Sequence, residues 1–207
     1  MADKIKFSQD RSVIIMGQQG WGKSTLGNSL IQEISKHIPI IVFNTQGGNQ
    51  FMQSKNVAVY SPPTIKQNND LLKLFNKFIV LLRAKFSNFG IYIVDLEKFF
   101  LEKSVISFDT SELKDLYVSG RHQRILKIIE CKQPRFIPQT IIANSNLLFI
   151  GYLLQNDRKN LTDYVSKEEL RDLKKYEFVC VDMWEGNRYV VNTKLELIKT
   201  LKPLNEL

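Results

Sequence analysis

A glycine-rich segment near the start of the chain carries residues that could hold a triphosphate. Residues 17–24 read Gly-Gln-Gln-Gly-Trp-Gly-Lys-Ser and match G-x-x-x-x-G-K-[ST], the Walker A pattern, at every fixed position. Because Gly17, Gly20 and Gly22 allow backbone angles closed to other residues, successive N–H groups can turn inward around an anion. In this pattern Lys23 reaches the β- and γ-phosphates and the Ser24 hydroxyl holds Mg²⁺. The predicted nucleotide-binding residues are Gly17, Gln18, Gln19, Gly20, Trp21, Gly22, Lys23, Ser24 and Thr25.

The segments on either side fit a phosphate-binding loop. Residues 12–16 form a short apolar run that predicts a buried strand, and apolar residues recur at helical spacing from Leu26 to Ile34. Pro39 ends this predicted helix, whose positive dipole end lies at the loop. The alternative is a glycine loop that only caps a helix. The fixed spacing of Gly, Lys and Ser between a strand and a helix favours triphosphate binding.

A second group of candidate residues follows another apolar run. Phe89-Gly90 is expected to turn the chain into a strand over residues 91–95 that ends in Asp95. An aspartate at the tip of a neighbouring strand holds the Mg²⁺ shell in phosphoryl-transfer sites, and Glu97 could polarise the attacking water. The alternatives are a helix N-cap for Asp95 and a first-turn acid for Glu97. With the glycine loop present, we predict Ser24 and Asp95 as metal-binding residues and Lys23, Asp95 and Glu97 as catalytic residues.

The remaining pattern is that of an α/β domain with a mostly parallel central sheet flanked by helices. Further buried strands are predicted over residues 40–43, 57–60, 125–129 and 147–150, and a long amphipathic helix over residues 65–86. After a helix that begins at Ser166, two strands flank Glu185-Gly186-Asn187 and predict a hairpin that extends the sheet. We expect one domain over residues 1–207, with a core of about 10–155 and the C-terminal helix and hairpin at about 160–195.

Composition and charge indicate which kinds of binding partner and which cellular compartment to expect. The chain has 207 residues, a formal net charge of +8 and 43% hydrophobic residues, as in an ordinary soluble globular protein. The charge favours a polyanionic partner such as nucleic acid, although a generally basic surface is the alternative. No apolar run approaches the roughly 18 residues of a membrane span, and the N-terminus does not read as a secretory signal. Cys131 and Cys180 fit a reducing compartment, with a disulfide between them left open.

Several segments together resemble one family of ATPases. The glycine loop, Asp95 with Glu97, Gly120-Arg121-His122 and the run from Gln133 to Pro138 are similar in order and type to the FtsK-HerA superfamily of P-loop ATPases. Within it, the chain resembles the genome-packaging NTPases of Sulfolobus turreted icosahedral viruses over about residues 10–192. The segment from Gly120 to Pro138 is the more discriminating part, because many unrelated NTPases share the glycine loop.

The resemblance implies a RecA-like sheet in which the strand before Gln133 lies between the glycine-loop strand and the Asp95 strand. It implies Gln133 as a polar sensor, ATP and Mg²⁺ as cofactors, and subunits in a homo-oligomeric ring around double-stranded DNA held by its phosphate backbone. Hydrolysis would drive a viral genome into a preformed capsid, with capsid or portal-vertex proteins as partners. The protein would then act in the host cytoplasm, where it would meet the procapsid or virion.

Two departures from the family pattern concern catalysis. In many members the catalytic glutamate directly follows the aspartate, whereas here Leu96 separates Asp95 from Glu97, so that Asp95 could serve alone. Some members carry an arginine finger where this chain has Leu147-Leu148. A finger would then come from Arg121 first, or from Arg83 or Arg135.

Other functions use the same loop. A small nucleotide kinase would need an arginine-rich lid over its second substrate, which the sequence does not suggest. A GTPase needs an N-K-x-D motif, and Asn76-Lys77-Phe78-Ile79 lacks the aspartate. A nucleotide-gated DNA-binding or assembly factor, in which hydrolysis is incidental, remains open.

Overall fold

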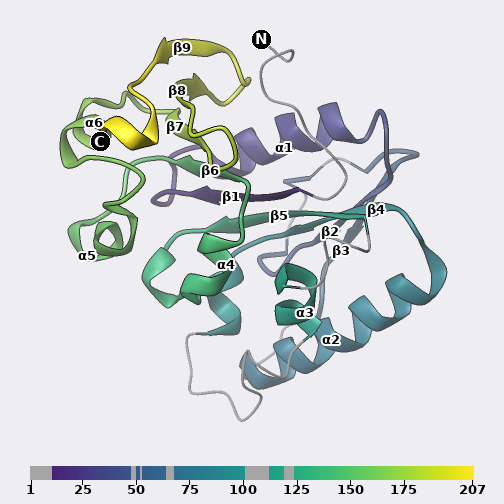
Figure 1. Cartoon of the computed structure of the whole chain (residues 1–207). Helices are drawn as coiled ribbons and strands as arrows, with labels where there is room; N and C mark the ends of the chain where they lie inside the picture. The colour runs from purple at the N-terminus through teal and green to yellow at the C-terminus, as the bar shows by residue number, and fades with distance from the viewer. Residues whose placement is uncertain (1–10, 48–49, 52, 64–67, 101–111, 119–123) are drawn as a thin grey trace.

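The nine strands of the described residues join in one sheet. The computed structural model describes residues 11–47, 50–51, 53–63, 68–100, 112–118 and 124–207 (Figure 1). From one edge, the parallel strands are β3 (Val57–Tyr60), β2 (Ile40–Phe43), β4 (Phe89–Ile93), β5 (Ile125–Cys131), β1 (Ser12–Met16) and β6 (Leu147–Ile150). The antiparallel strands β7 (Glu177–Asp182), β8 (Arg188–Asn192) and β9 (Leu197–Thr200) continue the sheet beyond β6.

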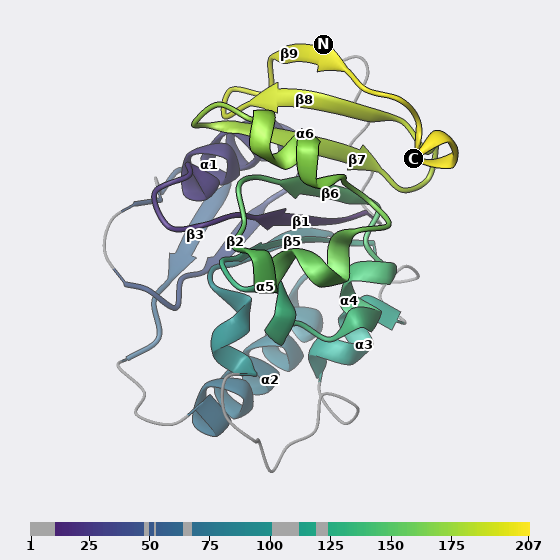
Figure 2. The ribbon, with the colours of Figure 1, turned by 90° about the vertical axis from the view of Figure 1, so that its left-hand side faces the viewer.

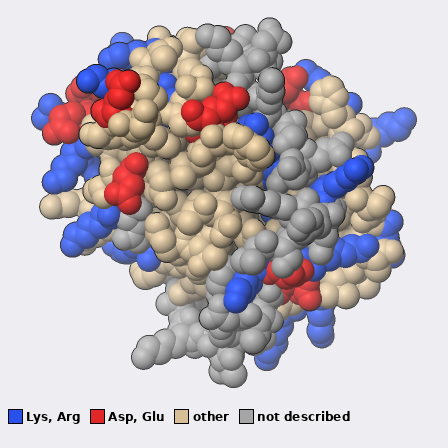
Figure 3. Space-filling model, in the orientation of Figure 1, with Lys and Arg blue, Asp and Glu red and all other residues tan. Residues whose placement is uncertain are grey.

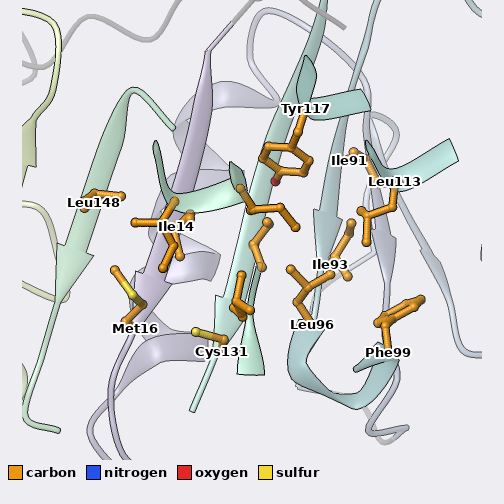
Figure 4. Packing of buried hydrophobic residues seen from close by; sticks show 14 of the residues in the cluster. Ile14, Met16, Ile91, Ile93, Leu96, Phe99, Leu113, Tyr117, Cys131 and Leu148 are labelled. Atoms are coloured by element: carbon orange, nitrogen blue, oxygen red, sulfur yellow. The ribbon is translucent and has the colours of Figure 1, made fainter. Parts of the chain in front are cut away.

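Helices cover both faces of the sheet. Helix α1 (Lys23–Ile34) lies on one face, whereas α2 (Asn68–Lys85), α3 (Glu112–Val118) and α4 (Gln139–Ala143) lie on the other (Figure 1). Alternate residues of each strand pack into two separate hydrophobic cores, because successive side chains of a strand point to opposite faces of the sheet. In β1, Val13 and Ile15 pack under α1, while Ile14 and Met16 join the larger core that Figure 4 shows beneath α3.

The strand order confirms the predicted arrangement around the loop. Strand β5, which precedes Gln133, pairs in parallel with β1 on one side and with β4 on the other. The carboxyl ends of these three strands therefore meet at one edge, where open α/β sheets bind ligands. The mostly parallel sheet with flanking helices is also confirmed.

The start of β4 differs from the prediction. Phe89 and Gly90 were expected to form a turn, but both lie within the strand, where Gly90 pairs with Ile40 and Leu126. A Cβ on Gly90 would approach Ile40 Cδ1 to 2.4 Å, so the glycine is there for close packing between neighbouring strands. The strand ends at Ile93, and Asp95 consequently lies two residues beyond it rather than at its tip.

The C-terminal part contains the predicted hairpin and one further strand. Strands β7 and β8 pair antiparallel, and α6 (Lys167–Asp172) begins with the predicted capping box, in which Ser166 and Glu169 exchange hydrogen bonds. Strand β9 pairs with β8 at the edge of the sheet and was not predicted, because all four of its residues are exposed. Figure 2 shows β7, β8 and β9 side by side above β6, with α6 and the short α5 (Gln155–Arg158) on the same side of the sheet.

Candidate nucleotide-binding site

The glycine loop is held in place by the strands that flank β1. Gly17 N donates to Cys131 O at the end of β5, and Gln18 N donates to Tyr152 O just after β6. Gly20 and Gly22 have φ values of 76° and 95°, in the left-handed region that favours glycine. Gly17 does not, and a Cβ there would meet only ordinary contacts at 3.7 Å. The expectation that all three glycines supply unusual backbone angles is therefore wrong for Gly17.

Replacing Gly22 should cost more stability than replacing Gly20. Alanine at either position meets a positive φ, which costs roughly 1–2 kcal/mol. At Gly22 the added Cβ would also lie 2.7 Å from Tyr176 Cδ1, whereas at Gly20 it would enter open space. Such overpacking adds about 1–3 kcal/mol. Chemical denaturation of Gly22→Ala and its matched control Gly20→Ala measures the difference, and equal losses would contradict the packing of Tyr176 on the loop.

A cavity of about 330 Å³ opens beside the loop. It lies where the carboxyl ends of β1 and β5 meet the start of α1, which is the predicted position of the phosphates. It is lined by Gln19, Gly20, Gly22, Lys23, Ser24, Thr25, Gln46, Gln50, Glu130, Lys132 and Tyr176. The six lining residues from the loop and the start of α1 are among the predicted nucleotide-binding residues, while those from other elements were not predicted.

Lys23 is buried at the cavity wall and is held by a backbone carbonyl. Its Nζ donates to Gln18 O at 3.2 Å, and the residue is only 4% exposed. Burial lowers the pKa of the Lys23 ammonium, although the negative charges of Glu130 and Asp95 act in the opposite direction. A buried cation at the first turn of a helix is well placed to receive phosphate oxygens.

Ser24 contacts a carboxylate that the sequence did not single out. Its Oγ lies 2.9 and 3.1 Å from the two carboxylate oxygens of Glu130, and Tyr92 Oη donates to Glu130 Oε2 at 2.9 Å. Glu130 is 1% exposed and lies one residue before the end of β5. Burial raises the pKa of the Glu130 carboxyl, while Lys23 and the hydrogen bonds from Tyr92 and Ser24 oppose that shift.

Asp95 is buried and is engaged by residues of the cavity wall. Its Oδ2 accepts hydrogen bonds from Gln46 Nε2 and, at 3.0 Å, from Lys132 Nζ. It occupies the N-cap position of the turn Leu96–Phe99, but its side chain makes no cap hydrogen bond. The alternative role as an N-cap is therefore not what holds the carboxylate. Asp95 Oδ1 is buried without a protein partner among the described residues.

Glu97 lies beside the end of β5. Its Oε1 accepts a hydrogen bond from Lys132 N at 3.0 Å, and its Oε2 is buried without a protein partner within the described part of the chain. Burial, together with the negative charge of Asp95, raises the pKa of Glu97 to about 7. A carboxyl group with a pKa near neutrality suits a general base.

The remaining candidates are the predicted sensor Gln133 and the three arginines considered for the arginine finger. Gln133 lies two residues beyond β5, which extends to Cys131 rather than ending at the predicted residue 129, and it begins the turn Pro134–Phe136. Arg121 lies outside the described residues, together with Gly120 and His122. Arg83 pairs with Glu112 at 2.6 Å and with Asp115 at 2.8 Å between α2 and α3. Arg135 lies 3.7 Å from Asp157 and stacks on Phe136.

Trp21 connects the loop to the C-terminal hairpin. Its indole Nε1 donates to Glu177 O at 2.8 Å, at the start of β7, and its ring packs on Tyr152. A Cβ on Gly151 would lie 2.4 Å from Trp21 Cδ1, so the glycine after β6 leaves room for the indole. The Trp21 side chain thus anchors the loop to β7.

Besides Glu130, four residues of the cavity wall were missed, for different reasons. Gln46 and Gln50 belong to a polar loop after β2, whose place at the carboxyl end of a strand is where open α/β sheets bind ligands. Lys132 directly precedes the predicted Gln133, and its pairing with Asp95 needs the β4–β5 register. Tyr176 comes from the C-terminal part and has a φ of 72°. No local pattern places that residue near the loop.

The donor set fits Mg²⁺ shared with a nucleotide. Among the described residues no group of three or more His, Cys, Asp and Glu side chains could hold a metal ion by itself. Mg²⁺ commonly takes only one or two carboxylates and completes its shell with water and substrate phosphates. The Ser24 hydroxyl, Asp95 Oδ1 and the Glu130 carboxylate supply hard oxygen donors of the kind it prefers.

Solved structures share this fold at low sequence identity. No family model matches the sequence, and no curated protein matches it. The genome packaging NTPase B204 from Sulfolobus turreted icosahedral virus 2, in complex with ATP-gammaS, is 17% identical with a TM-score of 0.70, covering 89% of this chain and 98% of its own. B204 from Sulfolobus turreted icosahedral virus, a DNA-packaging ATPase, is 19% identical with a TM-score of 0.71 and the same coverage.

This chain has the fold of a RecA-like P-loop ATPase. The resemblance to FtsK-HerA packaging NTPases is thereby confirmed at the level of the fold. The pCW3 conjugation coupling protein TcpA has the fold as well, with 19% identity, a TM-score of 0.54 and 86% of this chain covered, although this chain covers only 60% of TcpA. Within the described ranges, no helix of this RecA-like ATPase fold is long and apolar enough to cross a membrane.

Proposed function

We propose that the protein is an ATP-driven translocase of double-stranded DNA that packages a viral genome into a preformed capsid. The observation that carries the proposal is the cavity in which Lys23, Ser24 and the left-handed glycines converge at the carboxyl ends of central parallel strands. A fold that spans 98% of a genome packaging NTPase supports the more specific role. The acting form would be a homo-oligomeric ring in the host cytoplasm that contacts capsid or portal-vertex proteins.

The predicted residues of the site have the following roles in this proposal. The loop amides and Lys23 bind and orient the triphosphate of ATP, and Ser24 with Asp95 holds Mg²⁺. When bound, Mg²⁺ neutralises charge on the phosphates. Glu97 accepts the proton of the attacking water, and Gln133 senses the γ-phosphate. An arginine of the neighbouring subunit, with Arg121 as the first candidate, stabilises the developing charge. Positioning and charge stabilisation supply most of the catalysis in such sites.

The distribution of charge bears on how DNA would be held. On the face seen in Figure 3, Lys and Arg side chains are spread around the margin and acidic side chains lie among them. The net charge of +8 is therefore not gathered into one patch over the described part of this face. Contacts from several subunits around a ring would combine such scattered positive charges along the phosphate backbone.

The experiment that tests the function combines hydrolysis, assembly and movement. ATP hydrolysis is measured with and without double-stranded DNA, beside the assembly state by light scattering. Displacement of a block bound to the DNA is then followed. A packaging motor should show DNA-stimulated hydrolysis by an oligomer and ATP-dependent displacement. Hydrolysis without displacement would instead favour a nucleotide-gated binding or assembly factor, and phosphoryl transfer to nucleoside monophosphates would favour a kinase.

The affinity for DNA should fall steeply as the salt concentration rises, and it should not depend on the DNA sequence. Contacts to phosphates release counterions, so the logarithm of the binding constant falls linearly with the logarithm of salt concentration, by about 0.9 for each phosphate contacted. Fluorescence anisotropy with two duplexes of unrelated sequence, at a series of salt concentrations, measures both properties. Affinity that does not change between low and high salt would contradict contact through the phosphate backbone.

A further inference from the structure

A buried carboxylate lies inside the cavity where the proposed triphosphate would bind. Glu130 lines this cavity together with Lys23 and Ser24, and it comes from the middle strand of the three that build the site. The roles proposed above for Lys23, Ser24 and Asp95 in hydrolysis assign no part to this residue. It is nevertheless the acidic side chain in direct contact with the Ser24 hydroxyl, at 2.9 and 3.1 Å.

The environment of Glu130 is built to keep the carboxylate in one position. Tyr92, from β4, is fully buried and donates its hydroxyl proton to Glu130 Oε2 at 2.9 Å. Gly27 of α1 makes room for that tyrosine, because a Cβ there would lie 2.0 Å from Tyr92 Oη. Residues from β4, β5 and α1 therefore fix the carboxylate against the first turn of α1. The hydrogen bond from Tyr92 thus fixes the direction of the Glu130 carboxylate, which packing alone would not do.

A fixed carboxylate at this place opposes a bare triphosphate. Two negative groups brought together in a partly buried cavity repel each other much more strongly than they would in water. Lys23 offsets part of the charge, but it is also the group that would serve the phosphates. A divalent cation between the carboxylate and the phosphates turns the repulsion into attraction, because hard oxygens of both kinds are the ligands Mg²⁺ prefers.

Asp95 is less able to repel a metal-free triphosphate, because cations already lie against its carboxylate. Lys132 Nζ contacts its Oδ2 at 3.0 Å, Lys98 Nζ lies 3.8 Å from the same atom, and Gln46 donates a hydrogen bond to it. The charge of Asp95 is therefore largely matched by neighbouring cations. Within the described part of the chain, Glu130 is the carboxylate that both lines the cavity and touches Ser24.

We propose that Glu130 makes nucleotide binding conditional on Mg²⁺, by repelling a metal-free triphosphate and by joining Ser24 in holding the metal of the complex. The inference rests on the proposed nucleotide-binding function and adds a residue to that site. It predicts a coupling between metal and nucleotide, and such coupling is reciprocal by thermodynamic necessity. Removing the negative charge of Glu130 should raise the affinity for metal-free nucleotide. It should also reduce the increase in nucleotide affinity that Mg²⁺ brings.

The test compares affinities for a non-hydrolysable ATP analogue by calorimetry, in excess Mg²⁺ and in EDTA. Glu130→Gln keeps the size of the side chain and a carbonyl that can accept from Tyr92 or Ser24, but removes the charge. We expect the ratio of the two dissociation constants to fall at least about tenfold relative to wild type, within the usual range of coupling between two ligands. Part of that change should be tighter binding in EDTA, which loss of structure cannot produce.

Asp182→Asn is the matched control, because Asp182 is also a buried carboxylate but lies at the end of β7. In Asp182→Asn the ratio of the dissociation constants measured in EDTA and in Mg²⁺ should equal that of the wild type. An unchanged ratio in Glu130→Gln, or an equal loss of affinity with and without Mg²⁺, would overturn the inference. Failure of the wild type to bind the analogue under either condition would instead overturn the proposed nucleotide-binding function, so the two failures are distinguishable.

Discussion

Lys23→Ala is expected to abolish ATP hydrolysis. Lys23 is the buried cation at the first turn of α1, and its ammonium is held beside the cavity by Gln18 O. In the proposed site it orients the β- and γ-phosphates and stabilises charge as the terminal phosphoryl group departs. Losing one such preorganised donor typically costs about 10²–10³-fold in kcat. Because the same group contributes to ground-state binding, nucleotide affinity should fall as well.

Steady-state phosphate release and calorimetric nucleotide binding measure both effects. Lys36→Ala provides the control, since Lys36 follows the same helix but its side chain is 62% exposed and pairs with Glu33. That variant should hydrolyse ATP as the wild type does. Circular dichroism establishes that Lys23→Ala is folded. A folded Lys23→Ala protein with wild-type turnover would remove the lysine from the mechanism.

Glu97→Gln is expected to bind nucleotide normally and to stop turnover. The carboxyl is held next to β5 by Lys132 N, its other oxygen has no protein partner among the described residues, and its pKa is raised to about 7. These are properties of a group that takes a proton from water. General-base catalysis contributes about 10²–10⁴-fold, so turnover should fall within that range. Glutamine keeps the size and polarity but cannot accept the proton.

Single-turnover hydrolysis separates this effect from slow product release. Glu33→Gln is the control, because the Glu33 side chain is half-buried at the end of α1 and does not line the cavity. Normal turnover in Glu97→Gln would dismiss Glu97 as the base and would leave Asp95 to act alone. Loss of nucleotide affinity in this variant would show that Glu97 contributes to binding, against the separation of roles proposed for it.

Much of the fold could be predicted from the sequence because its signals are local. The phosphate loop has fixed spacing, the buried strands are continuous apolar runs, and the capping box at Ser166 and the turn at Gly186 mark their own positions. The placement of β5 between β1 and β4 came from the family resemblance rather than from any local pattern. Strand β9 was missed since exposed edge strands bury too little to show the apolar signature.

The site was harder to predict because its contacts cross long stretches of chain. Ser24 and Glu130 are 106 residues apart, and their contact depends on β5 pairing directly with β1. Glu130 also sits within an apolar strand, where periodicity gives no reason to single out one acid. Trp21 was predicted only as a member of the loop, and its hydrogen bond to Glu177 O, 156 residues away in the sequence, could not be read from any local pattern.

The most direct test of the account is where a triphosphate binds. A non-hydrolysable ATP analogue carrying a photoreactive γ-phosphate is crosslinked to the protein in Mg²⁺, and the modified peptide is identified by mass spectrometry. The account predicts crosslinks to the glycine loop or to the other segments that line its cavity, lost when unmodified ATP competes. Crosslinks only to residues elsewhere in the chain, or none that ATP displaces, would contradict it.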